Sequence, residues 1–302
     1  MSYNQPKLSL CASWNLNATT FADKYTIGQQ SSGLFIDIAN NMYVSDGENG
    51  RILIWHNETL IPTKTIIDED LIKPWSLFVT IDNDIFVDNG NLNNRIDKWT
   101  SNMTSHKSVM NVNGSCTGLF VDINANLYCS SVNQHRVVRF AFSSDFALPI
   151  IVAGTGCPGP ITNMLDHPHG IFVDISFNLY VADTYNNRIQ RFLPNEMNAV
   201  TVTGFGAGMY FILNRPTCIV TDADGNLFIV DSHSHRIVRS TPYGFQCLVG
   251  CSGESGVLPN QLNNPQTMAF DNSGNIFVTD FNNHRIQKFI LVTNSCGTSV
   301  NF

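Results

Sequence analysis

Histidines are the residues of this chain best suited to chemistry, because imidazole is both a common general base and the commonest protein ligand of metals. His167 and His169 flank Pro168, and His233 lies in a neighbouring loop of the expected fold. A catalytic zinc needs about three protein ligands and one open coordination position. Nothing in this spacing compels such a set. We therefore predict no bound metal, no cofactor and no catalytic residue.

Other motifs of enzymes are absent from the sequence. It contains no G-x-S-x-G nucleophile elbow, no phosphate-binding P-loop and no G-x-G-x-x-G between a strand and a helix. The glycine-rich run 204–208 falls where a strand should turn into the next repeat, so we interpret it as a loop. These observations favour a non-enzymatic role.

The elements that position these residues are set by an internal repeat. Six segments align without gaps, except that the second has one extra residue. In each segment the third expected strand begins at an arginine, and successive arginines are 41 to 52 residues apart. Within the fourth repeat, a β-branched and aromatic run at 171–173 is followed by a polar turn at 174–178 and a second run at 179–181. Such alternation predicts strands, and no window shows a convincing helical period. A repeat of this length corresponds to one four-stranded blade.

The repeat predicts an all-β, six-bladed β-propeller. We expect one domain over residues 1–302, with blades near 32–72, 73–114, 115–157, 166–206, 215–252 and 264–293. Too few residues follow the last repeat to complete its sheet, so the N-terminal run 7–13 is predicted to add its outer strand and close the ring. That closure would bring Cys11 near Cys296, and we consider a disulfide between them one of the open pairings.

The pattern G-[IL]-F-V-D, N-[LI]-[YF]-V-[AST]-D and N-[NH]-R-[IV] resembles the NHL repeat, and its copies cover about residues 32–289. The resemblance implies a six-bladed propeller with a central channel. Amidating lyases of this superfamily hold zinc with histidines at the first-strand entrances, whereas only His169 occupies such a position here. One regulatory family of NHL propellers binds RNA through a basic face, a feature that this chain lacks.

Acidic and basic residues recur around the second loop of each repeat. Because they stand at equivalent points, we interpret them as structural clasps rather than as catalytic groups. The second and third repeats have Asn89 and Ser131 at the acidic position. The predicted clasp residues are Asp46, Arg51, Arg95, Arg136, Asp183, Arg188, Asp231, Arg236, Asp280 and Arg285.

Positions that differ between repeats are the more informative about binding. The residue before each first strand should face the channel mouth, and there Trp75 and His169 break a ring of small hydroxyl side chains. The predicted channel-lining residues are Ser32, Thr117, Thr217 and Thr267. Large or hydrogen-bonding side chains on the same face form the predicted binding set, which is Trp75, His169, His167, Tyr185, His233, Phe281 and Asn282.

Composition bounds the partners and the compartment. The formal net charge of −7 gives no electrostatic footprint for nucleic acid, and no apolar stretch could span a membrane. Eight cysteines and sequons at Asn17, Asn57, Asn102 and Asn113 favour an extracellular or secretory-pathway glycoprotein. Residues 1–30 show no signal peptide, so a cytoplasmic protein with buried thiols such as Cys129 and Cys218 remains the alternative.

These observations lead to two hypotheses of function. The first is a monomeric propeller that binds a protein, peptide, glycan or small ligand on the loop face around its channel. The alternative is a metal-dependent lyase- or hydrolase-like propeller with its site at the channel mouth. A bound metal and loss of turnover on replacement of His169 would favour the enzyme.

Overall fold

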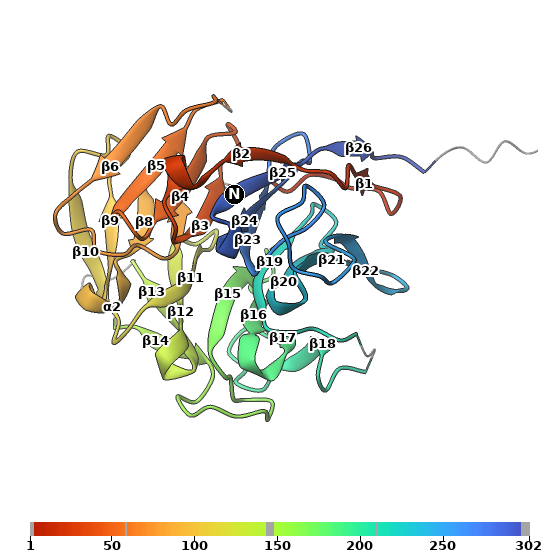
Figure 1. Ribbon diagram of the computed structural model, residues 1–302. Coiled ribbons are helices and arrows are strands. Elements are labelled where there is room, and N and C mark those ends of the chain that lie inside the picture. The colour runs from red at the N-terminus through yellow and green to blue at the C-terminus, as the bar shows by residue number, and fades with distance from the viewer. Residues whose placement is uncertain (1–2, 58, 143–147, 209–210, 297–302) are drawn as a thin grey trace, which may run out of the picture.

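The computed structural model describes residues 3–57, 59–142, 148–208 and 211–296. Six four-stranded antiparallel sheets are arranged around one axis like the blades of a propeller (Figure 1). The predicted all-β, six-bladed fold is therefore confirmed.

The blades follow one another in chain order. Blade 1 comprises β3 (Ser31–Ile36), β4 (Met42–Asp46), β5 (Arg51–Trp55) and β6 (Lys64–Ile67). Blade 2 comprises β7 (Leu77–Val79), β8 (Ile85–Asp88), β9 (Arg95–Trp99) and β10 (His106–Asn111). Blade 3 comprises β11 (Cys116–Val121), β12 (Asn126–Ser131), β13 (Arg136–Ala141) and β14 (Ile150–Ala153). Blade 4 comprises β15 (Pro168–Val173), β16 (Leu179–Asp183), β17 (Arg188–Phe192) and β18 (Val200–Gly204). Blade 5 comprises β19 (Pro216–Thr221), β20 (Leu227–Asp231), β21 (Arg236–Thr241) and β22 (Gly244–Val249). Blade 6 comprises β23 (Pro265–Phe270), β24 (Ile276–Asp280), β25 (Arg285–Phe289) and the N-terminal strand β2 (Thr19–Ala22).

The second strands of the blades are largely buried, because each sheet is covered by its neighbours on both faces. In β4 and β20 every residue is buried. This packing explains why the second strand of each repeat is nearly continuous in apolar residues rather than alternating with polar ones. The short helices α1 (Lys24–Ile27) and α2 (Gly90–Asn93) and four 3-10 turns lie outside the sheets. The turns are η1 (Val132–Gln134), η2 (Thr184–Asn186), η3 (Ser232–Ser234) and η4 (Phe281–Asn283).

An N-terminal strand closes the ring, although it is not the run that the sequence predicted. The outer strand of blade 6 is Thr19–Ala22, which pairs antiparallel with β25, whereas the prediction placed it at residues 7–13. Leu8 is instead buried in a cluster with Trp14 and Phe228, and Arg239 donates to the carbonyl oxygens of residues 9 and 10. Burial of its apolar side chains against blades 5 and 6 thus removes this run from the sheet. The following residues form the ribbon of β1 (Ser13–Trp14) and β26 (Leu291–Thr293).

Three disulfides stabilise the described part of the chain. Cys11 is bonded to Cys296, which lies 285 residues later, and the other pairs are Cys116–Cys129 and Cys247–Cys251. Cys129 is therefore not the free thiol that the cytoplasmic alternative requires. Cys157 is free and exposed, and Cys218 is free and buried. Three intramolecular disulfides suggest an oxidising, extracellular environment. Among the described residues, no helix is long and apolar enough to cross a membrane.

We expect the Cys11→Ser, Cys296→Ser double variant to lose about 2–4 kcal/mol of unfolding free energy, because this disulfide closes a very long loop in the unfolded chain. The measurement is urea unfolding followed by circular dichroism. The matched control is Cys247→Ser, Cys251→Ser, which opens a loop with a sequence separation of only 4 and should have a smaller effect. Equal losses in the two variants would contradict the expectation.

Candidate functional site

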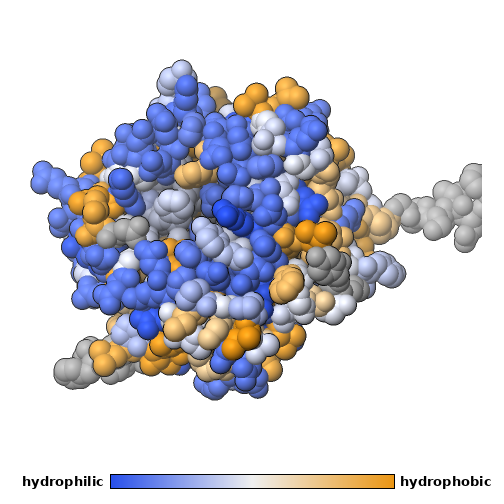
Figure 2. Space-filling view, turned by 60° about the horizontal axis from the view of Figure 1, so that its bottom comes forward, coloured by the Kyte–Doolittle hydropathy of each residue, from blue (hydrophilic) through white to orange (hydrophobic). Residues whose placement is uncertain are grey.

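One face of the ring is formed by the loops between the second and third strands and by the entrances to the first strands, and we call it the loop face. The short helix α2 and the turns η1 to η4 all lie in these second loops. Figure 2 brings the lower edge of Figure 1 forward, and the surface seen there is mostly hydrophilic with scattered apolar patches.

The recurring acid and arginine form buried ion pairs in four blades. The Nε atom of the arginine lies 2.7–2.8 Å from a carboxylate oxygen in the pairs Asp46–Arg51, Asp183–Arg188, Asp231–Arg236 and Asp280–Arg285. Burial raises the pKa of Asp183, while hydrogen bonds and Arg188 act in the opposite direction. The same carboxylate accepts the backbone N–H of Asp166, in the entrance loop of its blade, at 2.7 Å. The clasp therefore fixes the loop that leads into the first strand.

Blades 2 and 3 use their arginines differently. Arg95 pairs with Asp97, two residues later, at 2.9 Å, and Asn89 donates to that carboxylate. Arg136 donates to the side-chain oxygen of Gln134 at 2.6 and 2.9 Å. The substitutions at the acidic position thus shift the arginine's partner without removing the arginine from its loop.

Hydroxyl groups at the channel mouth join neighbouring blades. Ser32 donates to the carbonyl oxygen of Trp75, and Thr117 donates to that of Pro168. Thr217 and Thr267 make the same kind of bond to the entrances of blades 6 and 1. The four predicted channel residues therefore have a structural role, and Ser32 is buried. Thr117, Thr217 and Thr267 line a central cavity of about 120 Å³.

The N-terminal segment enters the channel from the opposite side. The ring of Tyr3 packs edge-on against Phe78, Phe120 and Phe172, which are at equivalent positions of three first strands. Asn4 donates to the carbonyl oxygen of Phe270 in blade 6. These contacts narrow the channel at the end away from the loop face.

Two groups of predicted binding residues are brought together. Trp75 and Phe281 come from blades 2 and 6 and have ring centroids 6.0 Å apart, so they meet across the entrance of blade 1. His167 stacks on Tyr185 with a centroid separation of 4.1 Å and an angle of 21°. The guanidinium of Arg215, which the sequence analysis did not select, lies 4.7 Å from the centroid of Tyr185.

The other three predicted residues have different surroundings. Asn282 is exposed and its amide donates to Asn263 at 3.3 Å. Burial lowers the pKa of His233, and the charge of Arg215 lowers it further. Burial also lowers the pKa of His169 to about 4, with a further contribution from His167, so the imidazole of His169 is neutral at neutral pH.

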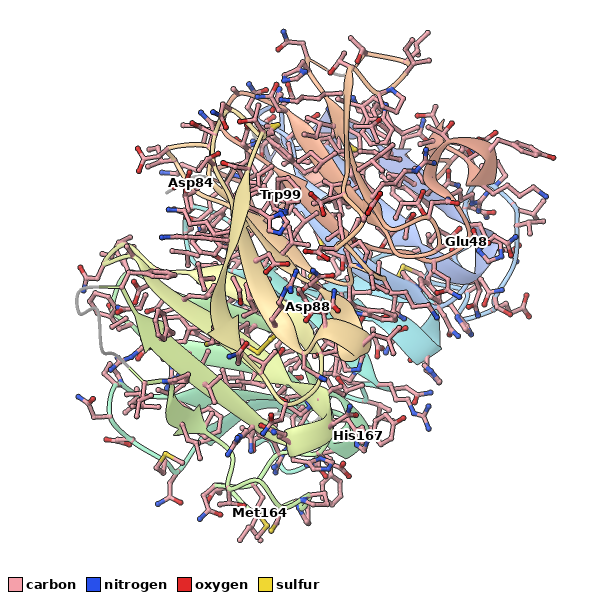
Figure 3. All side chains as sticks on the ribbon, turned by 90° about the vertical axis from the view of Figure 1, so that its left-hand side faces the viewer. Glu48, Asp84, Asp88, Trp99, Met164 and His167 are labelled. Atoms are coloured by element: carbon pink, nitrogen blue, oxygen red, sulfur yellow. A yellow bond between two sulfur atoms is a disulfide. The ribbon has the colours of Figure 1, made fainter. Side chains whose placement is uncertain are left out.

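A third group joins the histidine motif to a residue from blade 3. The Nδ1 atom of His167 lies 2.7 Å from Oδ1 of Asp166, and Nδ1 of His135 lies 3.4 Å from the same oxygen. Figure 3 shows His167 and Glu48 toward one side of the ring and Asp84 toward the other. Sequence reasoning treated His135 only as a repeat position and did not select Asp166. The entrance pattern Leu-x-x-Pro could have revealed them. Its two middle residues are Asn-Arg in blade 5 and Asn-Asn in blade 6, but they are Asp166-His167 in blade 4.

Comparison with known sequences bears on the family. The NHL repeat model matches residues 213–239 and 262–289, which span β19, β20 and most of β21 in blade 5 and β23 to β25 in blade 6. The chain is a six-bladed β-propeller that contains NHL repeats at these two positions. No curated protein matches it in sequence.

Solved structures share the fold of this NHL propeller at low sequence identity. A streptogramin B lyase is 13% identical with a TM-score of 0.63, and the match covers 91% of this chain and 97% of the lyase. An auxiliary nutrient-binding protein from Bacteroides thetaiotaomicron is 18% identical with a TM-score of 0.67, covering 96% of this chain and 75% of that one. A chain of a nidogen/laminin complex is 18% identical with a TM-score of 0.58, covering 75% of this chain and 83% of that one. Since similar rings serve in catalysis and in binding, the fold alone does not assign a function.

Proposed function

We propose that this NHL propeller is a monomeric, extracellular binding module that takes its ligand on the loop face between blades 4 and 5. The ligand class that we propose is a small molecule, peptide or glycan that carries an anionic group beside a planar ring. The observation that carries this proposal is the row of three side chains formed by His167, Tyr185 and Arg215.

The row offers donors to a ligand at its exposed edge. Arg215 is exposed, and among the described residues no carboxylate lies within ion-pair distance of its guanidinium. The backbone N–H of Arg215 donates to the side-chain oxygen of Asn187 at 2.8 Å, which fixes the start of the arginine side chain. Tyr185 is 46% exposed, and the stacking of His167 restricts its ring. A guanidinium held over an aromatic ring is well suited to pair with a carboxylate or sulfate while the ring edge contacts the ligand.

The compartment proposal is supported by exposure of the sequons. Asn17, Asn57, Asn102 and Asn113 are all exposed, so each could carry a glycan. None of them lies in the row of His167, Tyr185 and Arg215.

The alternative enzyme at the channel mouth has less support. The hydroxyls of Ser32, Thr117, Thr217 and Thr267 donate to backbone carbonyls of neighbouring blades. Around His169, these groups are thus committed to the ring rather than free to bind a substrate or metal.

We expect benzoate to bind the loop face and Arg215→Gln to weaken its binding about tenfold, since a hydrogen bond to a charged group contributes on the order of 1.5 kcal/mol. The measurement is titration with benzoate by NMR, with neutral benzamide as the ligand control. The matched variant is Lys73→Gln, because Lys73 is an exposed cation at the equivalent entrance position of blade 2 with the same left-handed backbone. Equal affinity for benzoate and benzamide, or an equal loss in both variants, would refute an anion site at Arg215.

A further inference from the structure

Two imidazoles and one carboxylate converge at the boundary between blades 3 and 4. His135 lies at the end of η1, while Asp166 and His167 lie in the entrance loop of blade 4. One ligand atom from each of the three residues falls within 4.8 Å of the others. Their side chains are 14%, 26% and 34% exposed, so an ion from solvent can reach the group.

Comparison with blade 6 separates what the fold requires from what it does not. At the equivalent point, Nδ1 of His235 accepts the backbone N–H of Asn264 at 3.2 Å, as Nδ1 of His135 accepts that of His167 at 3.2 Å. Both donors have the same left-handed backbone, with φ of 48°. The histidine at the end of the second loop thus accepts the same backbone hydrogen bond at the boundary of blades 3 and 4 and at that of blades 5 and 6. The fold does not require an acid and a second imidazole, because blade 6 carries Asn263 and Asn264 there.

The electrostatics of the group favour a cation. Oδ1 of Asp166 faces Nδ1 of both histidines. Nδ1 of His135 accepts an N–H, so in that state it carries no proton to donate to the carboxylate. A carboxylate oxygen therefore faces an unprotonated ring nitrogen at 3.4 Å, and a positive ion between the two would stabilise both. The N–H contact of 3.2 Å is at the long end of the hydrogen-bond range and competes only weakly for the lone pair.

The spacing suits a transition metal. Bonds of about 2.0–2.2 Å in a tetrahedral zinc site place neighbouring ligand atoms about 3.3–3.6 Å apart. The separation of 3.4 Å between His135 and Asp166 lies in this range, whereas the 2.7 Å contact between His167 and Asp166 is a hydrogen bond that must open when the metal binds. Imidazole ligands favour zinc, cobalt, nickel or copper over calcium and magnesium. The surroundings also hold the ligands in place, because Asp183 binds the backbone of Asp166 and Tyr185 stacks on His167.

We propose that His135, Asp166 and His167 bind one divalent transition-metal ion, of which Zn²⁺ is the best match, with at least one coordination position open to solvent. This site differs from the channel mouth, where the alternative hypothesis from the sequence places a metal. It shares His167 with the proposed anion site, but that site is tested with a different ligand and with Arg215→Gln, which leaves all three metal ligands in place.

The test is titration of the metal-free full chain with Zn²⁺ by calorimetry and with Co²⁺ by absorption spectroscopy, in a Cys157→Ser background. That background is needed because Cys157 is a free, exposed thiol in the loop that leads to β15. We expect one equivalent of metal per chain. We expect the Asp166→Asn, His167→Asn double variant to weaken metal binding at least 100-fold. Its loop should fold, because two asparagines, Asn263 and Asn264, already occupy the equivalent entrance of blade 6.

Two further variants keep the proposal open to refutation. His235→Ala removes the equivalent imidazole of blade 5, at its boundary with blade 6, and should leave metal binding unchanged. Asn263→Asp, Asn264→His, introduced into the Asp166→Asn, His167→Asn chain, should restore one equivalent by completing a set with His235. Absence of a stoichiometric metal in the parent chain, unchanged affinity after Asp166→Asn, His167→Asn, or loss of binding in His235→Ala would each overturn the site.

Discussion

Replacement of Asp183 by asparagine should lower the free energy of unfolding by about 3–5 kcal/mol, because it leaves a buried guanidinium without its counter-charge. The side chain of Arg188 is only 4% exposed, and its Nε lies 2.7 Å from the carboxylate of Asp183. Its other donors bind the carbonyl oxygens of Pro160, Ile161 and Met164, so water cannot easily replace the lost partner. Urea unfolding at neutral pH measures the effect.

The ring contains a matched control for this prediction. Asp46 and Arg51 form the same pair at the same distance in blade 1, and Asp46 is as fully buried as Asp183. The side chain of Arg51, however, is 27% exposed and can be hydrated when its partner is neutral. Asp46→Asn should therefore cost only about 1–2 kcal/mol. Similar losses in the two variants would mean that burial of the arginine does not determine the strength of the clasp.

The ring could be predicted from the sequence because each repeat has the same local pattern of residues. The apolar second strand, the polar turn and the arginine recur in register, so one interpretation explains six segments. The closing strand was misplaced because pairing there depends on packing between distant residues. Leu8 is buried against blades 5 and 6, and Thr19–Ala22, which is less apolar, is left to pair with β25. Local hydrophobicity does not reveal that choice.

The candidate site was only partly predictable, for a related reason. His167 and Tyr185 were selected because they are large or hydrogen-bonding side chains on the loop face, and the structure stacks their rings. His135 was interpreted only as a structural position, because a histidine recurs there in three repeats. Its contact with Asp166 crosses the boundary between blades 3 and 4, and a comparison of single repeats does not reveal such a contact. Arg215 was overlooked because its backbone position is a repeat feature, whereas its side chain is not. A residue at a repeated position can thus have a structural backbone and a functional side chain.

A carboxylate in blade 2 has no equivalent in the other blades. Asp88 ends β8 at a position that holds Ser45 in blade 1 and Ser130 in blade 3. It is fully buried and accepts hydrogen bonds from the hydroxyl of Ser115 at 2.6 Å and the backbone N–H of Cys116 at 2.9 Å. Burial raises the pKa of Asp88 to about 7, against hydrogen bonds that lower it, and the charge of Asp97 raises it further.

This pKa makes stability depend on pH with a definite sign. An unfolded aspartate has a pKa of about 3.9, so between about pH 4 and 7 the folded state retains a proton that the unfolded state releases. The stabilising contribution of Asp88 is therefore fully present below about pH 4, falls as the pH rises, and is lost above about pH 7. From pH 5 to 8 the loss should be about 3 kcal/mol.

Replacement of Asp88 by asparagine should remove this part of the pH dependence, since the amide keeps an oxygen for the N–H of Cys116 but does not titrate. The measurement is the free energy of unfolding in urea at pH 5 and pH 8 for both proteins. Other buried acids, such as Asp183, contribute equally to both and cancel in the difference. Asp84→Asn is the control, because the side chain of Asp84 is 21% exposed and pairs with Lys98. Parallel pH profiles for the parent chain and Asp88→Asn would show that burial does not hold the proton on Asp88.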